Sequence, residues 1–355
     1  GAVSSRYAMP AGILVLGILT VIYTYKGGMR AVVWTELIQG GIYIVGGIAA
    51  VVLLGQSIPG GWSAILHSAQ AAGKLRMIDW YTGFDRPFTV LAGLLGGAFL
   101  SMASHGADQL IVQRLLSARS LRDAQKAVIG SGVAVLVQMA LFLIIGIGLW
   151  AHFGGRAFAS PDNIFPTFIL QAMPPGLLGL VIAAIIAATM STLSGTINAL
   201  AASATHDIYL PITGRAASDP RTLRVGKRLA LFWGFVLTVG ALLYRQQGTP
   251  VVVIALSIAS FTYGGLLGGF FLALFVPRAR QRDAIVGMSV GIAAMAIVVF
   301  AKQLASAYPS LATSLGPLGA IAWPWYVLIG TILTLLTGTL SSFARRPRPD
   351  DAPAT

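Results

Sequence analysis

About nine apolar runs, all but the short first one long enough to cross a lipid bilayer as a helix, limit what this chain can fold into. Because hydrocarbon offers no hydrogen-bond partners, each run must satisfy its own backbone, and an α-helix does so. Charged residues make up only 10% of the chain and hydrophobic residues 56%, whereas soluble chains average about 25% charged residues. We therefore predict an all-α, polytopic membrane protein. The expected helices lie near residues 11–25, 31–54, 88–112, 124–150, 175–206, 223–244, 249–276, 283–303 and 321–343.

The basic residues predict the orientation of these helices. Most of the 24 Lys and Arg residues lie in alternate connections, near residues 26–30, 114–126, 215–228 and 278–282 and after residue 344. Because positive residues concentrate in cytoplasmic loops, we expect the N-terminus outside and the C-terminus in the cytoplasm, with the protein integral to the cell (inner) membrane. The net charge of +13 is then explained by basic residues in the cytoplasmic loops. We therefore expect the lipid bilayer as a partner and no nucleic acid.

We expect residues 1–344 to form a single transmembrane transporter domain and the proline-rich residues 345–355 to form a disordered cytoplasmic tail. The chain begins at Gly1, without Met and without a signal-peptide pattern. This beginning predicts that the domain is incomplete at its N-terminus and that the chain starts inside a longer protein.

The stretch 177–207 is apolar at first and then becomes small and hydroxylated. Its small and polar residues recur every three or four positions, which places them on one helix face: Ala184, Ala188, Ser191, Ser194, Gly195, Asn198 and Ala202. Hydroxyls in hydrocarbon need partners, either on another helix or in a desolvated cation. Close helix packing, with Ser and Thr bonded to their own backbone, is the alternative interpretation.

Glu36 is the one glutamate of the chain and lies on the second expected helix, with Gln39 one turn further on. An acidic residue inside a helix bundle is costly unless it is paired or binds a cation, so Glu36 is a functional candidate. Glu36 also follows Arg30 by less than two helical turns, so simple pairing with a basic loop residue is the alternative.

Polar residues also interrupt the apolar runs of two other helices. In the run at 88–112, Gly106 weakens the helix and can let it bend or unwind, whereas Asp108 and Gln109 are better explained as a helix cap. Broken helices at mid-membrane are where transporters expose backbone groups to substrates and ions. The candidate substrate-binding residues are Ser101, Ser104 and His105 in this run, and Ser257 and Ser260 in the run at 249–276, where nearby glycines also indicate close packing.

Several classes of function are excluded by what the sequence lacks. It contains no phosphate-binding P-loop, no Rossmann glycine fingerprint and no His-Glu-x-x-His zinc motif. It also contains no cysteine, and its histidines are scattered. We therefore expect no catalytic residues, no enzyme activity and no organic cofactor.

Three stretches resemble signatures of the sodium:solute symporter family. They are GGMRAVVWTELIQ at 27–39, DQLIVQR at 108–114, and MSTLSGTIN at 190–198 followed by DIY at 207–209. The stretches occur in the order of the family and on the helices where the family carries them, and the resemblance extends over essentially the whole chain.

The resemblance implies a leucine-transporter-like fold of two inverted five-helix repeats, of which this chain resembles the C-terminal two thirds. It implies a main sodium site formed by the Ala188 carbonyl and the Ser191 and Thr192 hydroxyls, shared with a helix that precedes this chain. Some members have a second sodium site, here assigned to Glu36 and Ser194, although Glu36 replaces an Asp and Gly195 replaces a Ser of those members. Na⁺ is then the coupling ion and the one metal expected.

The predicted function is therefore sodium-coupled import of a small polar solute (a sugar, organic acid or amino acid) by alternating access. A proton-coupled transporter of the same fold, with Glu36 or His105 titrating, is one alternative. A non-transporting remnant or a membrane enzyme is another, if the chain is naturally this short. The identity of the solute, the ion stoichiometry and the oligomeric state stay open.

Overall fold

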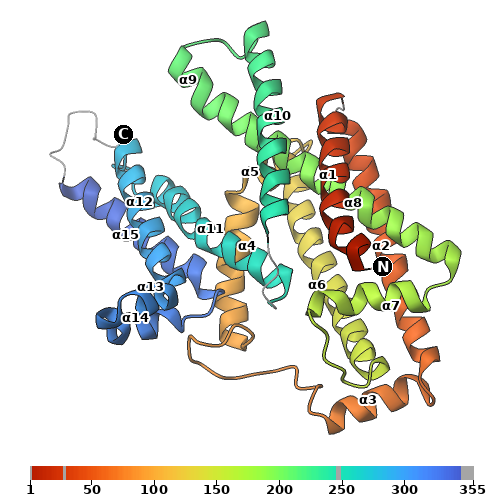
Figure 1. Ribbon diagram of the computed structural model, residues 1–355. Helices are drawn as coiled ribbons and strands as arrows, with labels where there is room; N and C mark the ends of the chain where they lie inside the picture. The colour runs from red at the N-terminus through yellow and green to blue at the C-terminus, as the bar shows by residue number, and fades with distance from the viewer. Residues whose placement is uncertain (1, 27–28, 245–248, 345–355) are drawn as a thin grey trace. The chain divides into compact units, whose positions relative to one another are not determined.

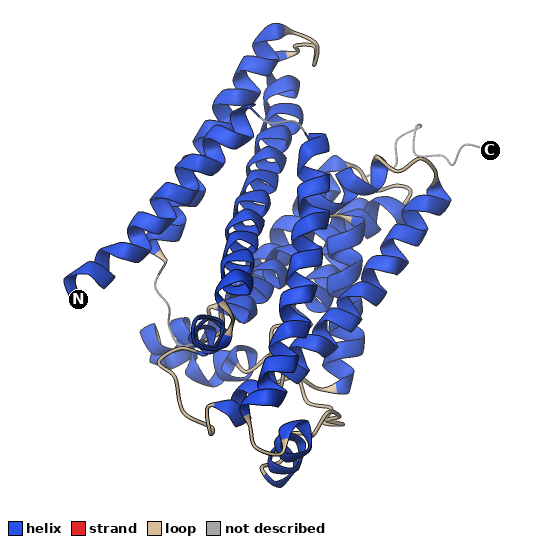
Figure 2. Cartoon of the chain, turned by 90° about the vertical axis from the view of Figure 1, so that its right-hand side faces the viewer, coloured by secondary structure: helices blue, strands red, loops and turns tan. Residues whose placement is uncertain are grey.

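The computed structural model describes residues 2–26, 29–244 and 249–344, with side chains except at 2–6, 26, 29–35 and 113. The tail predicted at 345–355 and the Gly27-Gly28 pair of the first motif lie outside the described residues. Within the described part of the chain, every regular element is a helix (Figure 2). Eight of these helices are long and apolar enough to cross a membrane. The prediction of an all-α, polytopic membrane protein is thus confirmed.

The chain is divided into two compact units, of which the first comprises Gly1–Leu75 and Ile129–Gly248. Leu121–His152 (α6) lies mostly in this unit, although its first residues belong to the second. The other helices of the first unit are α1 (Ala2–Lys26), α2 (Met29–Ser57), α3 (Gly61–Ala71), η2 (Pro161–Asn163), α7 (Ile164–Ala172), α8 (Pro175–Ser203), η3 (Ala204–Tyr209), α9 (Leu210–Thr213) and α10 (Pro220–Leu243).

The core of the first unit lies where α2, α6, α7 and α8 meet. Leu54, Ile145 and Phe168 are fully or almost fully buried there, and Val181 of α8 packs at the edge. The short helix α3 is attached by Trp62, whose indole Nε1 donates to the Val51 carbonyl at 3.0 Å. These contacts hold α8, the helix that carries the predicted sodium residues, against α2.

The second unit comprises Arg76–Val128 and Thr249–Thr355. Its helices are η1 (Ala92–Gly96), α4 (Gly97–Gly106), α5 (Gln109–Leu116), α11 (Val251–Phe275), α12 (Gln281–Val299), α13 (Ala301–Ala307), η4 (Pro309–Leu311), α14 (Ala312–Gly319) and α15 (Trp325–Ala344). The helices α11, α12 and α15 lie side by side (Figure 1) and approach closely through glycines. A Cβ added to Gly264 of α11 would lie 2.8 Å from the Gly330 Cα of α15, the close approach that small residues permit between membrane helices.

The helix predicted at 88–112 is not continuous, which is why the structure has eight membrane-length helices where about nine were expected. The segment contains the π-helical turn η1, then α4, which ends at Gly106, and then α5, which starts after Asp108. Asp108 has an extended backbone and its carboxyl accepts from the Leu110 amide at 2.8 Å. The helix thus ends at Gly106, where the sequence allowed it to bend or unwind, but Asp108 caps the start of a new helix, whereas Asp108 and Gln109 were expected to cap one continuous helix.

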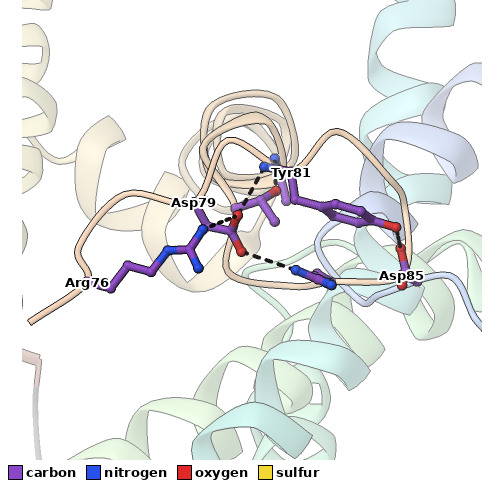
Figure 3. Close-up of polar contacts among 7 residues, drawn as sticks. Arg76, Asp79, Tyr81 and Asp85 are labelled. Carbon is purple, nitrogen blue, oxygen red and sulfur yellow. Dashed lines mark hydrogen bonds and ion pairs between the residues drawn. The ribbon is translucent and has the colours of Figure 1, made fainter. Parts of the chain in front are cut away.

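The segment between α3 and η1 has no helix and is ordered by side chains (Figure 3). Arg76 and Arg86 each lie 3.6 Å from the Asp79 carboxyl, and Tyr81 donates to Asp85 at 2.7 Å. The hydrogen bond from Tyr81 lowers the pKa of Asp85 and, in turn, raises the pKa of the Tyr81 phenol. The carboxylate thus stays charged and the phenol protonated at neutral pH. Because the two arginines are exposed, these contacts order the segment and add little stability.

Candidate functional site

The three residues predicted to hold sodium lie on one face of α8. Ala188, Ser191 and Thr192 are spaced i, i+3 and i+4, so the helix places them within one turn of each other. Ser191 is 4% exposed, and its hydroxyl donates to the Glu36 Oε1 of α2 at 3.0 Å. The structure thereby brings together the serine of the main predicted site and the acid of the second predicted site.

Ser194, the other residue of the second predicted site, has a different partner. A hydrogen bond of 2.8 Å joins its Oγ to Thr24 Oγ1 of α1, and Ser194 is 1% exposed. Thr24 was not among the sequence candidates. The available signal was its spacing of four from Thr20, which repeats hydroxyls on one face of α1, but the sequence does not say which helix that face meets.

A cavity of about 980 Å³ borders this face of α8 within the first unit. Ala188, Ser191 and Thr192 all line it, and so does Glu36, whereas Ser194 is not part of its wall. Most of the remaining wall is apolar and comes from α1, α2, α6, α7, α8 and α10, including Leu16, Gly46, Phe142, Ile169, Val181 and Leu237. Apart from Thr238 of α10, the polar side chains of the wall come from α2 and α8.

The atoms on this side of the cavity suit a hard cation. The Glu36 carboxylate and the Ser191 and Thr192 hydroxyls are oxygen donors, the ligand type that hard cations prefer. Within the described part of the chain, the Thr192 hydroxyl bonds to no other group, so its oxygen is available. The Ala188 carbonyl lies inside α8 and accepts one helix hydrogen bond, but a carbonyl oxygen has a second lone pair.

The predicted substrate residues lie in the second unit and are bonded mainly within their own helices. Ser104 Oγ lies 2.9 Å from His105 Nδ1 and 3.1 Å from the Ser101 carbonyl. Ser257 donates to the Val253 carbonyl of its own helix at 2.7 Å. Ser260 is fully buried and its Oγ has no hydrogen-bond partner in the described structure. The described hydrogen bonds therefore do not join the residues of α4 to those of α11.

A different pair connects α11 to the break between α4 and α5. The Tyr263 hydroxyl of α11 donates to the Asp108 carboxyl, which also caps α5 through Leu110. Tyr263 packs beside Ala103 and Leu267 in the small core of this unit. The broken segment is therefore held to α11 by Tyr263.

No group of three His, Cys, Asp or Glu residues that could hold a metal ion occurs among the residues that the structure describes. A family model described as "Sodium:solute symporter family" matches residues 6–291. The chain belongs to the sodium:solute symporter family. The resemblance seen in its motifs is confirmed.

Individual members of the sodium:solute symporter family are similar over most of this chain. The sodium/sialic acid symporter NanT of Aliivibrio fischeri is 27% identical over 336 residues, which cover 93% of this chain and 63% of the relative. The human sodium-coupled monocarboxylate transporter 1 is 28% identical over 307 residues, covering 84% of this chain and 49% of the relative. The chain thus spans less than two thirds of the length of these curated relatives, all of which are named as transporters.

The solved structure of a sodium-coupled transporter has the same fold. It is described as the substrate-bound outward-open state of a Na⁺-coupled sialic acid symporter that reveals a novel Na⁺ site. The TM-score is 0.76 at 26% identity, covering 94% of this chain and 66% of the other. The leucine-transporter-like fold predicted from the motifs is thereby confirmed.

Proposed function

We propose that this chain belongs to a sodium-coupled symporter that imports a small polar solute by alternating access. The observation that carries the proposal is the wall of α8, where Ala188, Ser191 and Thr192 line a cavity together with Glu36 of α2. Na⁺ bound there stabilises one conformation of the transporter over the other, so that the sodium gradient biases the direction of solute movement. The sodium-coupled relatives support this reading.

We assign Glu36 a direct part in ion binding. Its carboxylate lies on the cavity wall and is bonded to Ser191 at 3.0 Å, so an ion held by Ser191 lies beside a negative charge. A second ion at Glu36 and Ser194 would use the remaining lone pair of the Ser194 hydroxyl, which is bonded to Thr24 and does not line the cavity.

Ser101, Ser104 and His105 of α4 and Ser257 and Ser260 of α11 remain our proposed solute contacts. The unpartnered Ser260 hydroxyl is the member of this set that most needs a partner, because a buried polar group without a hydrogen bond costs about 1–3 kcal/mol. Relatives are named for sialic acid and for monocarboxylates. These two compound classes are therefore the first solutes to test.

The function is tested by uptake into proteoliposomes that contain the complete protein. We expect labelled sialic acid or a monocarboxylate to accumulate when an inward Na⁺ gradient is imposed and not when K⁺ replaces Na⁺. Uptake that follows an inward proton gradient and ignores Na⁺ would contradict sodium coupling and favour the proton-coupled alternative. Protein-free vesicles control for leakage.

We also propose that the protein lies in the cell (inner) membrane with the connection after α9 and the C-terminus in the cytoplasm, and that residues 1–344 act as a single transmembrane domain. The basic residues near 215–228 support this orientation. Since the chain has no cysteine, a single introduced thiol reports its own side of the membrane.

Ser218→Cys and Ser63→Cys form a matched pair for this test, because both serines are exposed and lie on opposite predicted sides. In intact cells, a membrane-impermeant maleimide is expected to label Ser63→Cys and to label Ser218→Cys only after the cells are opened. The reverse labelling pattern would show that the protein has the opposite orientation in the membrane. Labelling of both variants in intact cells would overturn the assignment of these connections to opposite sides.

A further inference from the structure

The first two turns of α10 carry an exposed group of four cations. Arg221, Arg224, Lys227 and Arg228 are all exposed. At 100° per residue they fall within an arc of about 120° on one helix face, and from first to last they span about 10 Å along the axis. Three of the four are arginines, whose planar guanidinium binds phosphate oxygens in a bidentate manner.

The same face of α10 becomes apolar in the following two turns. Leu231, Phe232 and Phe235 are 45%, 54% and 67% exposed, and their helical angles continue the arc of the four cations. Thr222, on the opposite face, is 4% exposed, and at the edge of the stripe a Cβ added to Gly234 would collide with Val21 of α1. One exposed stripe therefore runs from positive charge to aromatic hydrocarbon.

The acid next to this stripe is already engaged. Asp219 caps α10 by accepting from the Arg221 amide at 2.8 Å, and it pairs with Arg215 at 2.9 Å. These two contacts, the amide first, lower the pKa of Asp219, so its charge is balanced at neutral pH. Among the described residues, none of the four cations has an acidic partner within 4.0 Å. Lys227 has an aromatic neighbour instead, with its Nζ 5.0 Å from the Tyr25 ring centre.

We propose that the stripe on α10 binds an anionic phospholipid. The phosphate headgroup is held by Arg221, Arg224, Lys227 and Arg228, and the acyl chains lie along Leu231, Phe232 and Phe235. Charge complementarity selects an anion, because four cations without a carboxylate partner remain. The apolar continuation points to a lipid, because α10 is long and apolar enough to span a membrane and the cations at its start then lie at the level of the lipid phosphates. Clusters of basic residues beside a membrane helix attract anionic lipids in this way.

The test compares spin-labelled phosphatidylglycerol with spin-labelled phosphatidylcholine for association with the complete protein in phosphatidylcholine vesicles. Near a membrane surface, one Lys or Arg contributes about 1 kcal/mol, which is about a fivefold change in affinity. We therefore expect the selectivity for phosphatidylglycerol to fall at least fivefold in the triple variant Arg221→Gln, Arg224→Gln, Arg228→Gln. These side chains are exposed, so the variant is expected to fold.

A matched variant removes the same charge elsewhere: Arg119→Gln, Arg122→Gln and Lys126→Gln, all exposed and on the same predicted side. This variant is expected to keep the selectivity. An equal loss in both variants would overturn the proposal, because net charge alone would then attract the lipid. Competition by soluble glycerol phosphate at the affinity of the lipid would also overturn it in favour of a soluble phosphate site. Loss of selectivity in Phe232→Ala with Phe235→Ala would support the acyl-chain contact, and unchanged selectivity there would contradict it.

Discussion

Replacing Thr192 by valine or Ser191 by alanine is expected to raise the sodium concentration for half-maximal uptake by about tenfold or more. Each change removes one hydroxyl oxygen from the cavity wall of α8. Contacts between a charge and a polar partner contribute about 1.5–3 kcal/mol, and each 1.4 kcal/mol is a factor of ten in affinity. Thr192→Val is the cleaner change, since Ser191→Ala also breaks the hydrogen bond to Glu36.

The measurement is the sodium dependence of initial uptake rates, normalised to the amount of protein in the membrane. Thr189→Val is the matched control, because Thr189 lines the same cavity but its hydroxyl donates to the Ile185 carbonyl of its own helix at 2.8 Å. We expect this control to keep the sodium dependence of the parent protein. Unchanged sodium activation in both Ser191→Ala and Thr192→Val would remove α8 from the ion site. An equal change in Thr189→Val would indicate that altered packing around the cavity, and not the loss of an ion ligand, changes the sodium dependence.

The second large effect is expected at the contact between α11 and α15. Gly264→Ala would place a Cβ 2.8 Å from the Gly330 Cα and 3.2 Å from the Tyr326 carbonyl oxygen. These are backbone atoms and cannot rotate away, so the two helices must separate. Overpacking of this kind costs about 1–3 kcal/mol. We expect the apparent melting temperature in detergent to fall by a few degrees.

Gly97→Ala is the control for this change, because Gly97 lies in α4 of the same unit and a Cβ there meets nothing within 4 Å. Alanine is favoured over glycine in a helix by up to about 1 kcal/mol, so the control is expected to be neutral or slightly more stable. The melting temperature should therefore fall in Gly264→Ala and stay the same or rise slightly in Gly97→Ala. If Gly264→Ala melts at the temperature of Gly97→Ala or above, the close approach of α11 to α15 is not what stabilises this unit.

The membrane helices were largely predictable from local sequence. A helix in hydrocarbon satisfies the hydrogen bonds of its own backbone. A long apolar run such as that around α8 can therefore be predicted to be a helix without knowledge of the rest of the fold. The face that carries Ala188, Ser191 and Thr192 follows from helical periodicity for the same reason. Even the interrupted run near residue 106 had a local cause, since glycine weakens the helix and Asp108 caps the next one.

The partners across helices were not predictable in this way. Glu36 and Ser191 are 155 positions apart in the sequence, as are Asp108 and Tyr263. Periodicity assigns each residue to a face, but the register between two helices depends on how all their side chains pack. The pairing of Glu36 with the main predicted site, and of Ser194 with Thr24, therefore needed the tertiary structure.

By itself, the sequence determined the class of this protein: an all-helical membrane chain, with a hydroxylated face on α8 and the motifs of its family. Those features are local, since they depend on hydropathy, helix periodicity and short residue patterns. The tertiary structure alone decided that the face of α8 borders a cavity with Glu36 on its wall, and that the cations of α10 and the apolar residues that follow them on the same face are exposed. Whether a side chain is buried or exposed depends on which helices pack beside it, so the sequence of one helix does not determine it.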